Sequence, residues 1–154
     1  MAAFRPSCLL LGIALTLGCV SLSGGKEQFF VCSYEVVWDA ALNSVKDRSL
    51  RVQDKQNGLI ETNWTEMEGQ ERPYGLFRRE GFGNKERARL TLALKQQDDI
   101  TSVSVLETRQ RWHARGGATT QATKWWPVEP SEVAMNDVVN QLNSTLQDKG
   151  CAGT

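Results

Sequence analysis

Clustered histidine and cysteine are missing from this chain of 154 residues. It has one histidine, His113, and four cysteines, none in a CxxC spacing. Metal sites draw mainly on grouped cysteine, histidine and carboxylate side chains, and a catalytic nucleophile needs a base beside it. The chain also lacks the G-x-S-x-G motif of hydrolases, and its carboxylate pair Asp98-Asp99 fits a solvated turn. We therefore expect no metal, no other cofactor and no enzymatic activity.

An excess of either charge is also missing. Lysine and arginine together number 18, as do aspartate and glutamate. Nucleic-acid binding requires a basic surface, and electrostatic binding to anionic lipid requires a basic cluster. The sequence has no uninterrupted run of about 20 apolar residues, the length that crosses a bilayer as a helix. These absences argue against nucleic acid as a partner and against a transmembrane protein.

The first 19 residues have the pattern of an export signal. Arg5 precedes an apolar run at 8–17, and the small residue Gly18 comes just before Cys19. This order is typical of a secretory signal peptide, and the run is too short to span a membrane. The ending resembles a bacterial lipobox, although Thr16 stands where a bulky aliphatic residue is usual.

The lipobox resemblance implies a lipid anchor. In such signals the cysteine is lipidated, with palmitate among its acyl chains, and becomes the first residue of the mature chain. Residues 1–18 would then be the signal peptide, and 19–27 the lipidated cysteine with a short tether. In bacterial lipoproteins an aspartate after the lipidated cysteine signals retention in the inner membrane. Here Val20 has that position, which indicates the periplasmic face of the outer membrane. The alternative is an ordinary secreted protein cut near Gly18 or Ser23.

Two cysteines remain in the predicted domain at 28–154, one near each end. Without residues 1–18 the chain has 136 residues and a net charge of about −1, enough for one domain with a hydrophobic core. An exported protein can form a disulfide between Cys32 and Cys151, worth about 4–5 kcal/mol in the chain-entropy estimate. Two unpaired thiols are the alternative, because sequence does not show whether the ends meet.

Hydrophobic periodicity predicts an α+β domain with the element order β-α-β-β-β-β-α. An apolar stripe from Tyr34 to Val45 repeats with helical spacing, and a second one lies within 131–149. Alternating patterns predict five strands, at 28–32, 50–52, 59–64, 89–95 and 101–112. We expect a two-layer domain, in which both helices cover one face of an antiparallel sheet of four or five strands.

Capping and turn residues punctuate this pattern. Ser33 is a candidate N-cap for the first helix, and Gly150 is a natural stop for the second. Asn57-Gly58 is a strong hairpin signal, and Asp98-Asp99 predicts a polar turn. Trp38 falls on the apolar stripe of the first helix, so we expect it in the core.

The strand at 101–112 changes character along its length. Val103 and Val105 share one face, but Arg109 and Arg111 continue the same parity. We expect a β-bulge, or a twist of the strand past the edge of the sheet, to account for the change.

Two long predicted loops, at 65–86 and 113–130, hold the candidates for partner binding. Long loops in compact domains are often functional, and tryptophan and tyrosine are enriched at interfaces. The alternatives are a solvated loop for the arginines and closure of the core by one tryptophan. The candidate residues are Tyr74, Phe77, Arg78, Arg79, Trp125 and Trp126.

The helix at 34–42, followed by 50–52 and the G-L-I-E-T segment at 58–62, is similar to the helix-grip domain of BamC-type outer-membrane lipoproteins. That resemblance implies a lipid-anchored accessory subunit without catalytic residues that works beside the β-barrel assembly machine. This chain has one such domain where BamC has two, and it lacks the long segment that follows the lipidated cysteine in BamC.

The sequence therefore favours a non-catalytic, lipid-anchored envelope protein that serves as a binding or scaffold subunit of an outer-membrane assembly. The alternative is a periplasmic carrier of a lipid or small hydrophobic ligand, held in an apolar space between the helices and the sheet.

Overall fold

The computed structural model describes residues 24–69, 85–113 and 124–153. Two helices and eight strands make up an α+β domain, so the predicted fold class is confirmed. The elements are β1 (Lys26–Val31), α1 (Tyr34–Ser44), β2 (Leu50–Asp54), β3 (Leu59–Thr62), β4 (Thr65–Glu68), β5 (Lys85–Gln97), β6 (Ile100–His113), β7 (Lys124–Val128), α2 (Glu132–Asp148) and β8 (Ala152–Gly153).

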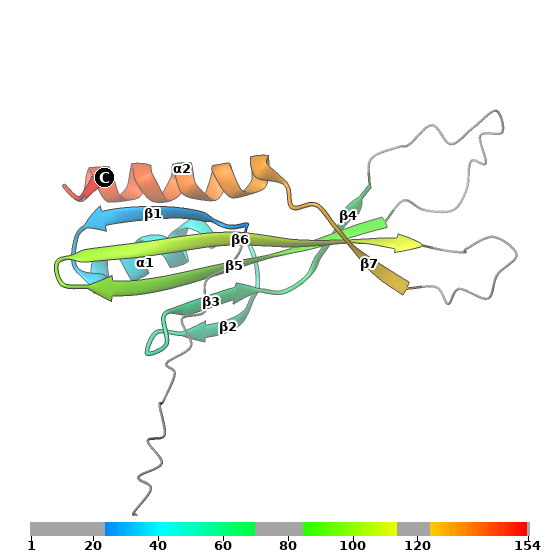
Figure 1. The fold of residues 1–154 in the computed structure, drawn as a ribbon, viewed down its shortest axis with the longest axis horizontal. Coiled ribbons are helices and arrows are strands. Elements are labelled where there is room, and N and C mark those ends of the chain that lie inside the picture. The colour runs from blue at the N-terminus through cyan, green and yellow to red at the C-terminus, as the bar shows by residue number, and fades with distance from the viewer. Residues whose placement is uncertain (1–23, 70–84, 114–123, 154) are drawn as a thin grey trace, which may run out of the picture.

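The strands form one antiparallel sheet with the order β2-β3-β5-β6-β1-β8 (Figure 1). Two more strands lie outside this path, since β4 pairs with β5 and β7 pairs with β6. The expected number of four or five strands was therefore too low. The additional strands β4, β7 and β8 have five residues or fewer, too short for a clear alternating pattern.

A long hairpin of β5 and β6 is the spine of the sheet. The two strands pair from Glu86↔Arg111 to Gln97↔Ile100 without a change of register. Asp98 and Asp99 close the hairpin as predicted, and Asp98 takes the left-handed conformation with φ 53°. The bulge expected in β6 is wrong, because Arg109 and Arg111 stay on the same face as Val103 and Val105. The alternative of a strand that passes the sheet edge is also wrong, because the later half of β6 pairs with β5 and β7.

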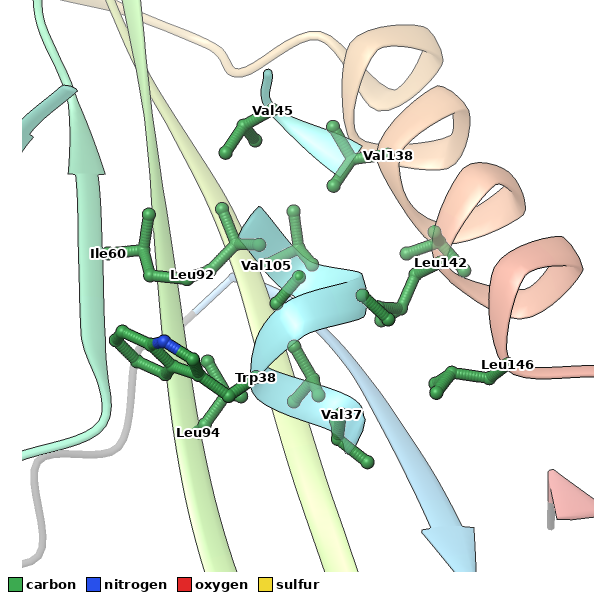
Figure 2. Packing of buried hydrophobic residues seen from close by; sticks show 14 of the residues in the cluster. Val37, Trp38, Val45, Ile60, Leu92, Leu94, Val105, Val138, Leu142 and Leu146 are labelled. Atoms are coloured by element: carbon green, nitrogen blue, oxygen red, sulfur yellow. The ribbon is translucent and has the colours of Figure 1, made fainter. Parts of the chain in front are cut away.

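Both helices pack on one face of the sheet, here called the helix face; the opposite side is the open face. The helix face of β5 and β6 is apolar where the helices cover it, and Trp38 is 2% exposed, as expected for a core residue. Figure 2 shows side chains of α1, α2 and the strands meeting between the layers. Members of this core include Val37, Trp38, Val45, Ile60, Leu92, Leu94, Val105, Val138, Leu142 and Leu146.

The helix ends use backbone and side-chain caps. The hydroxyl of Ser131 accepts a hydrogen bond from the N–H of Ala134 at 3.3 Å and caps α2. Ser33 occupies the N-cap position of α1 as predicted, but its side chain makes no capping hydrogen bond. Gly150 ends α2 with φ +77°, a conformation that suits glycine.

A disulfide joins Cys32, just after β1, to Cys151, just after α2. Their Cα atoms are 5.5 Å apart, and Cys151 is buried against the core. Immediately beyond it, β8 pairs with the end of β1. The bridge therefore fixes both ends of the domain at the same edge of the sheet.

Gly58 allows the β2–β3 turn to approach β5 closely. It has φ +66°, and its carbonyl accepts a hydrogen bond from the N–H of Leu94 at 2.7 Å. A β-carbon at this position would overlap the carbonyl oxygen of Leu94. The predicted Asn57-Gly58 turn thus has a steric as well as a conformational reason for its glycine.

Candidate functional site

Part of the sheet extends past the two helices, and we call it the distal sheet. It consists of β4, residues 85–89 of β5, residues 107–113 of β6 and all of β7. In Figure 1 these strands lie together at one end, whereas α1 and α2 flank the other part of the sheet. Its two faces must therefore be stabilised without the helix layer that covers the core.

A tryptophan–arginine ladder stabilises the open face of the distal sheet. The guanidinium carbon of Arg87 lies 4.4 Å from the centroid of the Trp64 ring and 4.3 Å from that of Trp125. Trp125 also meets Trp112 edge to face, with ring centroids 5.3 Å apart. Arg89 lies over Trp64 at 4.8 Å. Such cation–π contacts are worth about 0.5–2 kcal/mol each, so the ladder takes the place of an apolar layer.

Hydrogen bonds orient the guanidinium of Arg87. Gln110 is its direct partner across the β5–β6 pair. Nε and Nη2 of Arg87 both donate to Oε1 of Gln110, at 2.9 and 2.6 Å. Within the part of the chain that the structure describes, Arg87 forms no ion pair with a carboxylate. It is a fixed cation whose charge the described residues do not neutralise.

Arg89, by contrast, shares a carboxylate with the edge strand β2. Glu61 on β3 is buried and accepts from Nε and Nη2 of Arg51 at 2.8 and 2.6 Å. Nη1 of Arg89 lies 2.5 Å from Oε1, the same oxygen that accepts from Nε of Arg51. The hydrogen bonds from Arg51 and the charge of Arg89 hold the pKa of Glu61 below its usual value, although burial acts in the opposite direction. Glu61 is thus a structural carboxylate and is ionised at neutral pH.

An ion cluster of two glutamates and two arginines occupies the helix face of the distal sheet. Glu86 and Glu107 are each 2% exposed. Arg109 lies 3.1 Å from Glu86 Oε2 and from Glu107 Oε2, and Nε of Arg111 donates to Glu86 at 2.8 Å. Hydrogen bonding to Glu107 raises the pKa of Arg109. These charges balance, which explains why arginines follow valines on one face of β6 without a bulge.

The sequence indicated that Trp125 and Trp126 lie in a loop. They lie instead in strand β7. They pair with Trp112 and Arg111 of β6. Because neighbouring side chains of a strand project to opposite faces, only Trp125 joins the ladder. Trp126 lies on the other face, 38% exposed, with Nζ of Lys124 at 4.1 Å from its ring centroid. The aromatic character of β7 favours a strand, and Pro127 is tolerated because β7 is an edge strand.

The remaining predicted binding residues, Tyr74, Phe77, Arg78 and Arg79, lie outside the described residues, as does the predicted lipidation site Cys19. The single histidine, His113, is the last residue of β6, and its backbone pairs with Lys124.

Sequence reasoning missed Trp64, Arg87 and Trp112 as members of one site. The strand predicted at 59–64 included Trp64, but β3 ends at Thr62 and β4 begins at Thr65. A usable signal was present in β5, where Glu86, Arg87 and Arg89 put charged residues on both faces of one strand. A strand that is polar on both faces predicts a segment beyond the hydrophobic core.

Among the described residues, no three histidine, cysteine or carboxylate side chains are grouped to hold a metal ion. None of the helices in the described ranges is long and apolar enough to cross a bilayer. No family model matches the sequence, and no curated protein matches it either.

Proposed function

We propose that this chain is a non-catalytic, lipid-anchored protein of the bacterial envelope that acts as a binding or scaffold subunit of an outer-membrane assembly. The export signal and its lipobox-like ending support the anchor, and the resemblance to BamC-type domains supports the kind of assembly. The observation that carries the proposal is the distal sheet, which extends past both helices and presents tryptophan and arginine side chains.

Tryptophan and arginine contribute most strongly to the binding energy of protein interfaces. In the distal sheet they are held in place by neighbours, since Arg87 is bonded to Gln110 and stacked on two rings. A side chain that is already ordered loses little entropy on binding. Both the residue types and their preorganisation therefore support a protein-binding surface.

The structure favours this function over transport of a hydrophobic ligand. A carrier needs apolar space between its helices and its sheet. Here side chains of both helices and of the sheet, among them Trp38, Leu92 and Leu142, are buried in one cluster (Figure 2).

Site-specific photo-crosslinking in cells tests the binding function. A photoreactive phenylalanine analogue would replace Trp126, which is exposed on the distal sheet, or Val133, which is 70% exposed on α2. We expect a discrete cross-linked product from position 126 that is absent from position 133, and mass spectrometry would identify the partner. Equal products from both positions, or none from position 126, would contradict the proposal.

Membrane fractionation tests the anchor separately. We expect Cys19→Ser to release the protein into the soluble fraction, because the predicted acylation site is removed. Cys8→Ser is the matched control, since Cys8 lies inside the predicted signal peptide and should leave the anchor intact. If the Cys19→Ser chain still sediments with membranes, the anchor assignment is wrong.

A further inference from the structure

We propose that Arg87, between Trp64 and Trp125, forms a cradle for a carboxylate that an acidic segment of the partner protein supplies. This inference rests on the proposed function and names the chemistry that its surface recognises. Three observations carry it: an excess of hydrogen-bond donors, an unneutralised cation and a guanidinium held between two aromatic rings.

The donors around Arg87 outnumber the acceptors. Two of its five N–H groups reach Gln110, which leaves three without a partner among the described residues. The indole N–H groups of Trp64, Trp112 and Trp125 likewise have no described acceptor. These four residues are each half-buried, so part of each is exposed to a ligand. A group of donors without described acceptors favours an anion as the ligand.

The charge of Arg87 is likewise available. Arg51 and Arg89, on the same side of the sheet, both bond Glu61, so their charges are partly neutralised. Glu66 of β4 stands opposite Arg87 in the strand pairing, but it forms no ion pair with it within 4.0 Å. Indole rings on either side lower the local dielectric, which strengthens an ion pair made from outside.

The shape of the cradle favours a carboxylate. Trp64 comes from the β3–β4 side of the β5–β6 hairpin and Trp125 from the β7 side, each about one stacking distance from the guanidinium carbon. The guanidinium itself fills the space between the two rings, and Nε and Nη2 donate to Gln110. A carboxylate would therefore approach in the plane of the guanidinium, at the edge formed by Nη1 and Nη2, where it can receive two parallel hydrogen bonds. The same face already shows this pairing, because Arg51 bonds both oxygens of Glu61.

An NMR titration of the full mature chain, made soluble by Cys19→Ser, tests the cradle. The probe is an acetylated and amidated triglutamate peptide, and the neutral control is its triglutamine counterpart. We expect triglutamate to shift the indole N–H signals of Trp64 and Trp125 and the Nε–H signal of Arg87 in a saturable way. Triglutamine should leave them in place. Equal shifts with both peptides, or no saturable shift with triglutamate, would overturn the inference.

Variants separate the cradle from general charge attraction. We expect Arg87→Gln to weaken triglutamate binding by about tenfold or more, and Arg87→Lys, which keeps the charge but not the planar fork, to weaken it less. Lys85→Gln removes a neighbouring exposed charge of β5 and should change binding by less than about twofold. Equal losses in Lys85→Gln and Arg87→Gln would show diffuse attraction and overturn the cradle.

Inorganic phosphate is the competing anion. We expect it to displace triglutamate only weakly, and displacement at equal concentration would assign the site to phosphate and refute the carboxylate. If the peptide does not bind but position 126 still cross-links a partner, the carboxylate inference fails and the proposed function stands. If the cross-link at position 126 also fails, both the carboxylate inference and the proposed function are wrong.

Discussion

Glu107 of β6 accepts a hydrogen bond at Oε2 from the backbone N–H of Ser131, the residue that caps helix α2. The same carboxylate oxygen lies 3.1 Å from Nε of Arg109. A carboxylate at a helix N-terminus also interacts favourably with the helix dipole. The buried side chain of Glu107 therefore connects helix α2, which covers the hydrophobic core, to the ion cluster of the distal sheet.

Glu107→Gln should destabilise the protein by about 3 kcal/mol, because it leaves Arg109 short of a partner in a buried cluster. The free energy of unfolding would be measured by urea denaturation. The matched control is Glu132→Gln, whose carboxylate is 80% exposed and lies 3.8 Å from Lys26. We expect it to cost under about 0.5 kcal/mol, as is usual for surface pairs. Similar losses for the two variants would contradict the role given to Glu107.

Replacing both Cys32 and Cys151 by serine should lower the free energy of unfolding by about 4–5 kcal/mol, because the bridge closes a long loop in the unfolded chain. The measurement is urea denaturation of the oxidised wild type and of the variant. Wild type unfolded in the presence of a reductant is the control and should match the variant. An unchanged unfolding midpoint would refute the stabilising role of the bridge.

Stability should fall with acid partly through Glu61. Its pKa is lowered in the folded state from an ordinary value of 4.5, so the unfolded chain binds its proton first as the pH falls. The stabilisation is present above pH 4.5 and is lost as the pH drops through the folded pKa. Glu61→Gln should therefore lose less stability than wild type between about pH 6 and pH 3. Parallel curves of unfolding free energy against pH would contradict this assignment.

Gly58→Ala should cost more than about 1–2 kcal/mol, because alanine adds a clash with the Leu94 carbonyl to the strain of a positive φ. Gly150→Ala is the control, since φ there is +77° but no atom lies within 4 Å of the added carbon. We expect a smaller loss of thermal stability for Gly150→Ala. If the two losses are equal, the close approach of the β2–β3 turn to β5 contributes nothing.

Local patterns in the sequence predicted the parts of the fold that carry strong local signals. The stripe around Trp38 predicted α1, and the polar pairs Asn57-Gly58 and Asp98-Asp99 predicted both hairpin turns. The short strands β4 and β7 were not predicted, because each forms through pairing with an edge of the long β5–β6 hairpin. Such pairing is a tertiary effect that intrinsic propensity does not encode.

The candidate site was predictable only in part. Trp125 was singled out for its residue type, but its partners Arg87 and Trp64 come from two other segments, and only the strand register brings the three together. Likewise, Arg109 and Arg111 interrupt the apolar alternation of β6, and only the strand register, which places Glu86 opposite Arg111, explains them. The ladder and the ion cluster depend on long-range register, which no local periodicity reports.

The place of β1 in the sheet has a consequence for the order of folding during synthesis. This first strand lies between β6 and β8, so both strands that it pairs with are synthesised long after it. The β5–β6 hairpin can form as soon as both its strands have emerged, because its contacts are local. Strand β1 must therefore wait for β6 before it can join the sheet, and for β8 before the end of its outer edge is paired.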